Sequence, residues 1–243
     1  MTRTALVTGS SRGIGQAIAL AFAQGGYRVI VHGSKPSLKL DHTTTTVRSL
    51  SPESFSYPFN LADELAVTQA CQLLLKKVGA IDVLVNNAAI TRDQIFLRLT
   101  PAQWDTVIKT NLYGPFYVLK IVLPAMVKRR WGRIINLTSI AAKRGAYGKT
   151  NYAAAKAGLI ALTQSLAYEV GRYGITVNAI CPAWVKTDMS LSIPKKYRDQ
   201  ALSQVALQRM ATPKEIADLA SFLASDHSAY INGAVLDING GLS

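Results

Sequence analysis

Residues 8–15 of the chain read TGSSRGIG, with glycines at positions 9, 13 and 15. The apolar run ALV lies directly before this stretch, and residues 13–25 have the apolar spacing of a helix. Because glycine lacks a Cβ, backbone N–H groups and the positive end of the helix can approach a pyrophosphate closely. The stretch therefore predicts a dinucleotide site in a strand-to-helix turn. An ordinary glycine-containing turn is the alternative, and the position after the first strand disfavours it.

Short β-rich runs alternate with longer helical patterns along the rest of the chain. The expected strands are residues 4–8, 28–32, 54–59, 82–86, 133–138, 176–181 and 234–238. The expected helical stretches are 13–25, 62–78, 101–130, 150–173 and 213–224. This alternation predicts a single-domain, Rossmann-type, doubly wound α/β fold, in which helices cover both faces of a parallel seven-stranded sheet. Residues 35–52 contain the run LDHTTTTVRS, rich in β-branched threonine, and we expect only a short or frayed helix there.

The length and composition favour one domain. The 243 residues, 49% of them hydrophobic, suffice for one core spanning residues 1–243. No uninterrupted apolar run of about eighteen residues occurs, and the start MTRTALVTGS lacks the pattern of a signal peptide, so we expect a cytoplasmic protein without membrane spans. Cys71 and Cys181 are far apart and lack the spacing of a metal site, so we expect reduced packing residues and no metal.

The chain is strongly basic, with a formal net charge of +13 at pH 7. This sign attracts polyanions such as nucleic acid, nucleotide cofactors or an acidic carrier protein. Nucleic-acid-binding modules concentrate basic residues with interleaved aromatics, whereas here the basic residues are scattered between the predicted elements. We therefore expect no nucleic-acid partner.

The end of the second predicted strand bears on the choice of cofactor. A site that prefers NAD usually carries an Asp or Glu there, to bind the ribose 2′-OH. The chain instead reads VHGSK at residues 31–35, without a carboxylate. Arg12, Ser34 and Lys35 can match a 2′-phosphate in charge and hydrogen bonding, so the pattern predicts NADP(H). The alternative for Lys35 is a solvated loop cation.

A second group of residues predicts acid–base chemistry. In NYAAAKAG, Tyr152 and Lys156 are four residues apart and share one helix face. A nearby cation lowers the pKa of a tyrosine, so we expect Tyr152 to be a usable proton donor. Ser139 follows a predicted strand, where its hydroxyl can donate to a substrate carbonyl oxygen, and Asn111 can hold a proton-relay water. Taken alone, such a Tyr and Lys are more often a surface pair.

Together these motifs resemble the short-chain dehydrogenase/reductase family over the whole chain. TGSSRGIG is similar to the family's cofactor motif, NNAA at residues 86–89 to its NNAG element, and Asn111, Ser139, Tyr152 and Lys156 to its catalytic tetrad. The resemblance implies that Tyr152 is the acid, Ser139 orients the carbonyl, Lys156 binds the nicotinamide ribose and Asn111 organises the relay. The implied cofactor contacts are Gly9, Ser11, Arg12, Gly13, Ile14, Gly15, Ser34, Lys35, Asn60, Leu61, Asn87, Ala88, Tyr152, Lys156 and Thr187.

Within the family, residues 90–99, 151–160 and 230–241 are most similar to the bacterial 3-oxoacyl-acyl-carrier-protein reductases. This resemblance implies NADPH-dependent reduction of a 3-oxoacyl thioester to the 3-hydroxyacyl thioester in fatty-acid synthesis. Reduction of acetoacetyl-CoA or another small ketone is the alternative, and a non-catalytic nucleotide-binding regulator is a further one. Two residues depart from the pattern, because Ala89 and Ala183 stand where the family has glycine. Positive φ at either position would cost about 1 kcal/mol or more.

Two further segments bear on the substrate. Residues 188–211 follow the sixth predicted strand, and we expect them to form a mobile lid over the ligand edge of the sheet. Met189, Leu191 and Leu207 suit an acyl chain there, and ordinary helix packing explains them equally well.

Basic residues also gather before two predicted strands, in KRRWGR at residues 128–133 and at Arg172. This position lies at the sheet edge opposite the subunit's own active site. The resemblance implies a homotetramer, in which an acyl carrier protein would dock near Arg129 and Arg172 at a neighbour's entrance. The alternative is that these cations complete helix C-termini.

Overall fold

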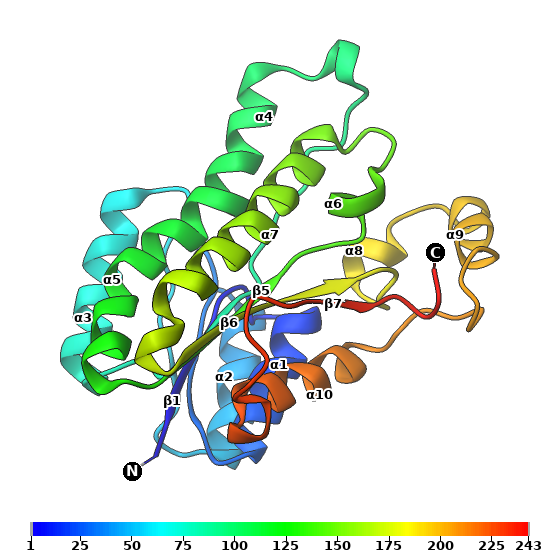
Figure 1. Cartoon of the computed structure of the whole chain (residues 1–243). Helices are drawn as coiled ribbons and strands as arrows, with labels where there is room; N and C mark the ends of the chain where they lie inside the picture. The colour runs from blue at the N-terminus through cyan, green and yellow to red at the C-terminus, as the bar shows by residue number, and fades with distance from the viewer. Residues whose placement is uncertain (1, 243) are drawn as a thin grey trace.

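The structure, a computed structural model, describes residues 2–242 and contains a sheet of seven strands in the order β3-β2-β1-β4-β5-β6-β7 (Figure 1). Every neighbouring pair is parallel. The strands are β1 Thr4–Val7, β2 Arg28–Val31, β3 Phe55–Ser56, β4 Val83–Asn86, β5 Gly132–Leu137, β6 Ile175–Pro182 and β7 Val235–Ile238. The predicted doubly wound α/β fold is confirmed, and each expected strand is present.

Helices connect the strands. They are α1 Gly13–Gln24, α2 Leu38–Leu50, α3 Glu64–Val78, α4 Pro101–Ile108, α5 Gly114–Arg129, α6 Ala141–Arg144, α7 Thr150–Val170, α8 Asp188–Leu191, α9 Lys195–Leu202 and α10 Pro213–Ala224. The shorter turns are η1 Phe96–Arg98, η2 Lys109–Tyr113, η3 Gly171–Tyr173 and η4 Asp226–Ser228. Helices α1, α2 and α10 cover one face of the sheet, and α3, α5 and α7 cover the other (Figure 1).

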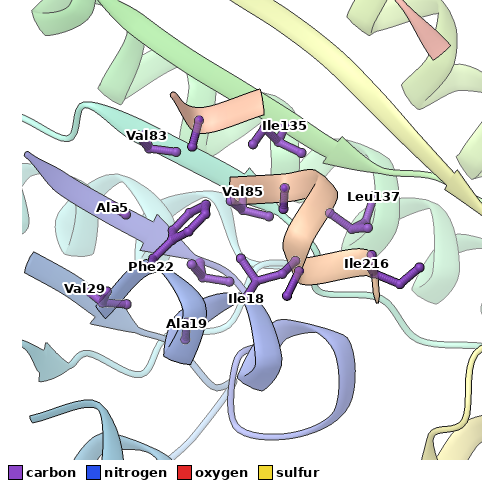
Figure 2. Close-up of a cluster of buried hydrophobic side chains, with 14 of the residues drawn as sticks. Ala5, Ile18, Ala19, Phe22, Val29, Val83, Val85, Ile135, Leu137 and Ile216 are labelled. Atoms are coloured by element: carbon purple, nitrogen blue, oxygen red, sulfur yellow. The ribbon is translucent and has the colours of Figure 1, made fainter. Parts of the chain in front are cut away.

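Two apolar layers enclose the sheet because successive strand residues point to opposite faces. On β1, Ala5 and Val7 belong to the layer under α1 and α10, whereas Leu6 belongs to the layer under α3, α5 and α7. Figure 2 shows the first of these layers, in which Phe22 and Ile18 of α1 lie against the strands. A sheet buried on both faces explains why its central strands read as continuous apolar runs.

The expectation of a short or frayed helix within residues 35–52 is wrong, because α2 extends over Leu38–Leu50. The Ser37 side chain caps it by accepting a hydrogen bond from the backbone N–H of Leu40. Leu40, Thr43 and Val47 are buried along one face of the helix. Tertiary packing of this face outweighs the weak helix propensity of the threonines.

The predicted stretch 101–130 is interrupted once. Helices α4 and α5 are joined by the π-helical turn η2, which contains Asn111. Such a turn inserts an extra residue into the helix and is frequent at functional sites. Asn111 is the buried residue of this turn.

Residues 188–210 form an excursion from the sheet and its covering helices, between β6 and α10. Val185 and Ala211 form a parallel bridge at the base of this excursion, and Lys186 donates a backbone hydrogen bond to the Ala211 carbonyl at 2.9 Å. The excursion contains α8 and α9, which lie together beside the C-terminal end of the chain in Figure 1. Its two ends are thus held side by side.

Three observations bear on the expectations from composition. Among residues 2–242, no helix is both long and apolar enough to cross a membrane. The same residues contain no cluster of three His, Cys, Asp or Glu suited to a metal ion. Cys71 and Cys181 are buried and are not disulfide-bonded.

Candidate active site

The glycine-rich turn joins β1 to α1 in a conformation that needs glycine. Gly9 has φ +64°, and a Cβ there would lie 2.7 Å from the Cα of Ala88. A Cβ on Gly15 would collide with the carbonyl oxygen of Gly9 and the side-chain amide of Asn87. The Asn87 amide donates to the carbonyls of Thr8 at 2.8 Å and Gly9 at 3.0 Å. The turn is therefore packed against the end of β4, which keeps its backbone open toward the cleft.

His32 at the end of β2 fixes the same turn, and the sequence analysis did not single it out. Its Nδ1 accepts a hydrogen bond from the backbone N–H of Gly9 at 3.0 Å, and its Nε2 lies 3.0 Å from the carbonyl oxygen of Phe59. These partners require a neutral ring that is protonated on Nε2. Burial lowers the pKa of His32 to about 4, which maintains that form. A histidine at the end of a predicted strand has no sequence pattern that indicates a hydrogen bond to the glycine-rich turn.

A cleft of about 330 Å³ lies over this turn, at the carboxyl ends of the strands. Its lining includes every residue expected to contact a cofactor except Lys35, an exposed residue that follows Ser34 of the lining. Other lining residues were not anticipated as contacts: His32, Gly33, Ala89, Ile90, Thr110, Leu137, Thr138, Pro182, Asp188 and Met189. The structure thus brings the glycine-rich turn, Asn87 and Ala88 of the NNAA element, and the Tyr152 and Lys156 pair together around one cavity, whereas Ser139 and Asn111 are not part of its lining.

The charged residues at the mouth of the cleft differ from those expected. Arg12 pairs with Asp188 of α8 at 2.9 Å, and Lys39 of α2 pairs with the same carboxylate at 3.2 Å. Lys39 was not predicted because it lies in the first turn of a helix that the sequence analysis underestimated. Two cations therefore share one carboxylate beside the glycine-rich turn, and Lys35 is not one of them.

Tyr152 and Lys156 lie in the inner part of the cleft, on α7. The Nζ atom of Lys156 is 5.8 Å from the centroid of the Tyr152 ring, so the expected proximity is present. However, burial raises the pKa of Tyr152 to about 12, and the hydroxyl of Ser139 lowers it only in part. The pKa therefore shifts in the direction opposite to the expected one, because desolvation of the phenolate outweighs its stabilising contacts.

Lys156 is almost fully buried, with 2% of its surface exposed. Its ammonium donates to the carbonyl of Leu137, at the end of β5, at 2.6 Å. Burial lowers the pKa of Lys156 to about 8, since a buried ammonium loses its hydration. The cation is thus held between β5 and α7, one helical turn from the phenol.

The fourth member of the predicted tetrad, Asn111, is fully buried in the turn η2. Its Oδ1 accepts from the backbone N–H of Ile90, and its Nδ2 donates to the carbonyl of the same residue, both at 2.9 Å. The side chain therefore clamps the loop after β4 to the junction of α4 and α5. Ile90 lines the cleft, whereas Asn111 itself does not.

Comparison with known proteins shows which family the chain belongs to. The family model described as enoyl-(acyl carrier protein) reductase matches residues 9–243. The chain is 41% identical over 242 residues to the 3-oxoacyl-[acyl-carrier-protein] reductase FabG of Staphylococcus epidermidis, covering 100% of this chain and 99% of the relative. The protein of the same name from Aquifex aeolicus is 38% identical over 240 residues, covering 99% and 97%. The chain belongs to the short-chain dehydrogenase/reductase family. It is an oxidoreductase that acts on CH–OH groups.

The two departures from the short-chain dehydrogenase/reductase pattern carry no backbone strain. Within residues 2–242, the residues other than glycine with positive φ are Arg130 and Gln208. Ala89 and Ala183 therefore adopt conformations open to any L-residue, and the cost considered for positive φ does not arise.

The apolar residues of the excursion separate in the structure. Met189 lines the cleft, but Leu191 and Leu207 do not. Leu207 lines a second cavity of about 80 Å³ beside Trp184 and Gly240. Only Met189 of the three therefore borders the proposed cofactor and substrate space.

Arg129 and Arg172 lie away from the cleft. Arg129 ends α5 and pairs with Asp82, just before β4, at 3.5 Å. Arg172, in η3, accepts a hydrogen bond on its carbonyl from the Arg130 guanidinium at 2.9 Å. Both residues are exposed at the edge of the sheet where the strands begin, whereas the cleft lies where the strands end.

Proposed function

We propose that this enzyme uses NADPH to reduce a 3-oxoacyl thioester carried by acyl carrier protein to the 3-hydroxyacyl thioester in fatty-acid synthesis. The observation that carries the substrate is the full-length similarity of 38–41% to relatives named 3-oxoacyl-[acyl-carrier-protein] reductase. We place this activity in the cytoplasm. Reduction of acetoacetyl-CoA by the same residues is the second candidate.

The residues of the cleft fit a dinucleotide with a 2′-phosphate. The backbone of the glycine-rich turn would hold the pyrophosphate, and the turn keeps this shape only with glycine at positions 9 and 15, because a Cβ at either would collide with Ala88, Asn87 or the turn's own backbone. The end of β2 carries no carboxylate, and Arg12, Ser34 and Lys39 offer positive charge and a hydroxyl to the phosphate. Bound NADPH would supply the hydride.

The chain's own residues would then handle the proton and the carbonyl oxygen. The Ser139 hydroxyl would donate to that oxygen as negative charge develops on it. With a pKa near 12, the Tyr152 phenol keeps its proton at neutral pH, and the alkoxide product is a stronger base that can take it. The buried Lys156 ammonium would stabilise the phenolate that remains.

The test of this function is the oxidation of NADPH with an acetoacetyl group carried by acyl carrier protein, by CoA, or by a small ester. We expect the highest kcat/KM with the carrier-bound substrate. A higher value with CoA would support the second candidate. NADPH binding without turnover on any substrate would instead support a nucleotide-binding regulator, and unchanged turnover in Tyr152→Phe would refute the assignment of the proton donor.

We further propose that the enzyme is a homotetramer and that acyl carrier protein docks near Arg129 and Arg172 of a neighbouring subunit. The net charge of +13 and the exposure of both side chains support an acidic partner. Arg172→Glu combined with Arg129→Glu should raise KM for the carrier-bound substrate and spare a small ketone. Equal losses on both substrates would refute this docking surface.

A further inference from the structure

A second cation lies beside the Tyr152 ring. The Nζ atom of Lys149, the residue before α7, is 5.8 Å from the ring centroid, the same distance as that of Lys156. Lys156 is buried and bonded to the backbone, whereas the Lys149 side chain is 24% exposed and forms an ion pair with Asp93. The proposed mechanism assigns no role to this pair.

The backbone on both sides fixes the Lys149–Asp93 pair. Asp93 lies in the loop after β4, where the N–H of Gln94 donates to the carbonyl of Gly148 at 2.8 Å. The fully buried Asn151 donates its side-chain amide to the carbonyl of Arg92 at 3.1 Å. These bonds flank the ion pair and join the loop to the start of α7. The two charges are thus held in place independently of their own attraction.

The polar and charged groups around the Tyr152 side chain come from four segments. They are Ser139 after β5, Cys181 on β6, Asp93 after β4, and Lys149 and Lys156 at α7. Burial raises the pKa of Cys181 to about 11, so this thiol is neutral at physiological pH. The Asp93 carboxylate raises the pKa of Tyr152, and Lys149 is the cation that pairs with it. The net charge beside Tyr152 at the start of α7 therefore depends on both Asp93 and Lys149 keeping their charges.

We propose that Lys149 and Asp93 are a positioning pair that sets the proton affinity of Tyr152 during carbonyl reduction and its reverse. The pair acts through the tyrosine and through the loop that it joins to α7. This inference rests on the proposed role of Tyr152 as the proton donor. It predicts that loss of either charge changes the proton affinity of Tyr152, with opposite signs for the two residues.

The test compares Lys149→Met, Asp93→Asn and the double variant in the oxidation of a 3-hydroxyacyl thioester, where Tyr152 must accept a proton. Lys149→Met leaves the Asp93 carboxylate unpaired, so the rise of kcat with pH should move up by about one pH unit, and kcat near neutral pH should fall about tenfold. Asp93→Asn should move the rise to lower pH. The double variant should return toward the wild-type profile.

Lys214→Met is the matched control, because Lys214 forms an exposed ion pair with Asp218 on α10 and should leave the profile unchanged. Losses of the same sign in both single variants, without movement of the pH profile, would show a merely structural pair and overturn the proposal. If Lys149→Met is inactive, Lys149→Arg, which keeps the positive charge, should restore the wild-type pH profile, and a failure to restore it would overturn the proposal. Full activity of Tyr152→Phe would instead refute the proposed function on which the inference rests.

Discussion

At the scale of single residues, His32 shows how burial fixes a protonation state that the fold requires. Its ring must be neutral to accept the Gly9 N–H, and burial lowers its pKa from 6.5 to about 4. In the unfolded chain the ring has its ordinary pKa and takes up a proton at a higher pH. The unfolded state therefore binds more protons between these values, and the folded state loses stability as the pH falls through this window.

We predict that the free energy of unfolding decreases by about 3 kcal/mol as the pH falls from 6.5 to about 4 because of this residue. Urea unfolding of the wild type and of His32→Gln across this range measures the effect. Since glutamine does not titrate, the variant should be less stable at neutral pH and should show a flatter dependence. Parallel curves for the two proteins would contradict the assignment.

Asp188 pairs with Arg12 and Lys39, the two cations that would bind the 2′-phosphate of NADPH in the proposed function. Its pKa is lowered by the hydrogen bond from Arg12 and then by that from Lys39, so it is charged at neutral pH and repels a 2′-phosphate. We predict that Asp188→Asn lowers KM for NADPH about two- to fivefold and leaves KM for NADH almost unchanged. Steady-state kinetics with both cofactors checks this. An equal change for both would mean that Asp188 acts only by holding α8 in place.

The candidate site also shows which residues a sequence can reveal. The spacing of Tyr152 and Lys156 on one helix is local, so it was readable directly. The direction of the Tyr152 pKa was not, because desolvation depends on packing from β5, β6 and the loop after β4. Lys39 and Asp188 meet across 149 positions of the chain, and no local pattern indicates that contact.

At the scale of elements, α2 is held by its buried face and its cap, since its threonine run favours other conformations. The helix also places Lys39 at the mouth of the cleft. Helix propensity along this segment is low, but the spacing of Leu40, Thr43 and Val47 indicates a helix packed on one side. By contrast, β1 and β4 could be predicted, because each is a short apolar run that alternates along the chain with helical patterns, as expected of a strand buried on both faces.

We predict that Leu40→Ala destabilises the protein by about 3 kcal/mol, because Leu40 is 1% exposed and its loss leaves a cavity. It should also raise KM for NADPH, as α2 carries Lys39. Leu38→Ala is the matched control, because Leu38 is 87% exposed and its removal should cost less than about 0.5 kcal/mol. Chemical denaturation and cofactor titration measure the two effects. Equal stability of the two variants would show that α2 contributes little to the fold.

At the scale of the whole molecule, a charged cluster joins distant parts of the chain at the edge where the strands begin. Asp226 accepts hydrogen bonds from Arg3, from the Trp131 indole and from the buried Arg133. The guanidinium groups of Arg3 and Arg133 also lie 3.8 Å and 4.5 Å from the centroid of the Trp131 ring. The cluster connects the N-terminus, β5 and the segment after α10.

We predict that Asp226→Asn lowers the free energy of unfolding by about 1 kcal/mol, since it weakens several contacts of which one involves a buried cation. The exposed pair of Lys214 and Asp218 provides the comparison, and Asp218→Asn should cost no more than about 0.5 kcal/mol. Urea unfolding at low and high salt separates the two. Identical costs would mean that the cluster contributes no more than an ordinary surface pair.

The bridge between Val185 and Ala211 holds the two ends of the segment that carries α8 and α9 side by side, so that this segment is a cassette tied to the rest of the fold chiefly through its ends, the ion pairs of Asp188 and the contact of Leu207 with Gly240. Its two stems are already adjacent, so doubling its length costs only about 0.6 kcal/mol in chain entropy. Such a cassette can be lengthened, shortened or exchanged while the sheet and Tyr152 stay as they are. Grafting a foreign segment between Val185 and Ala211 would therefore alter the part of the cleft that Asp188 and Met189 line while leaving Tyr152 and Lys156 in place.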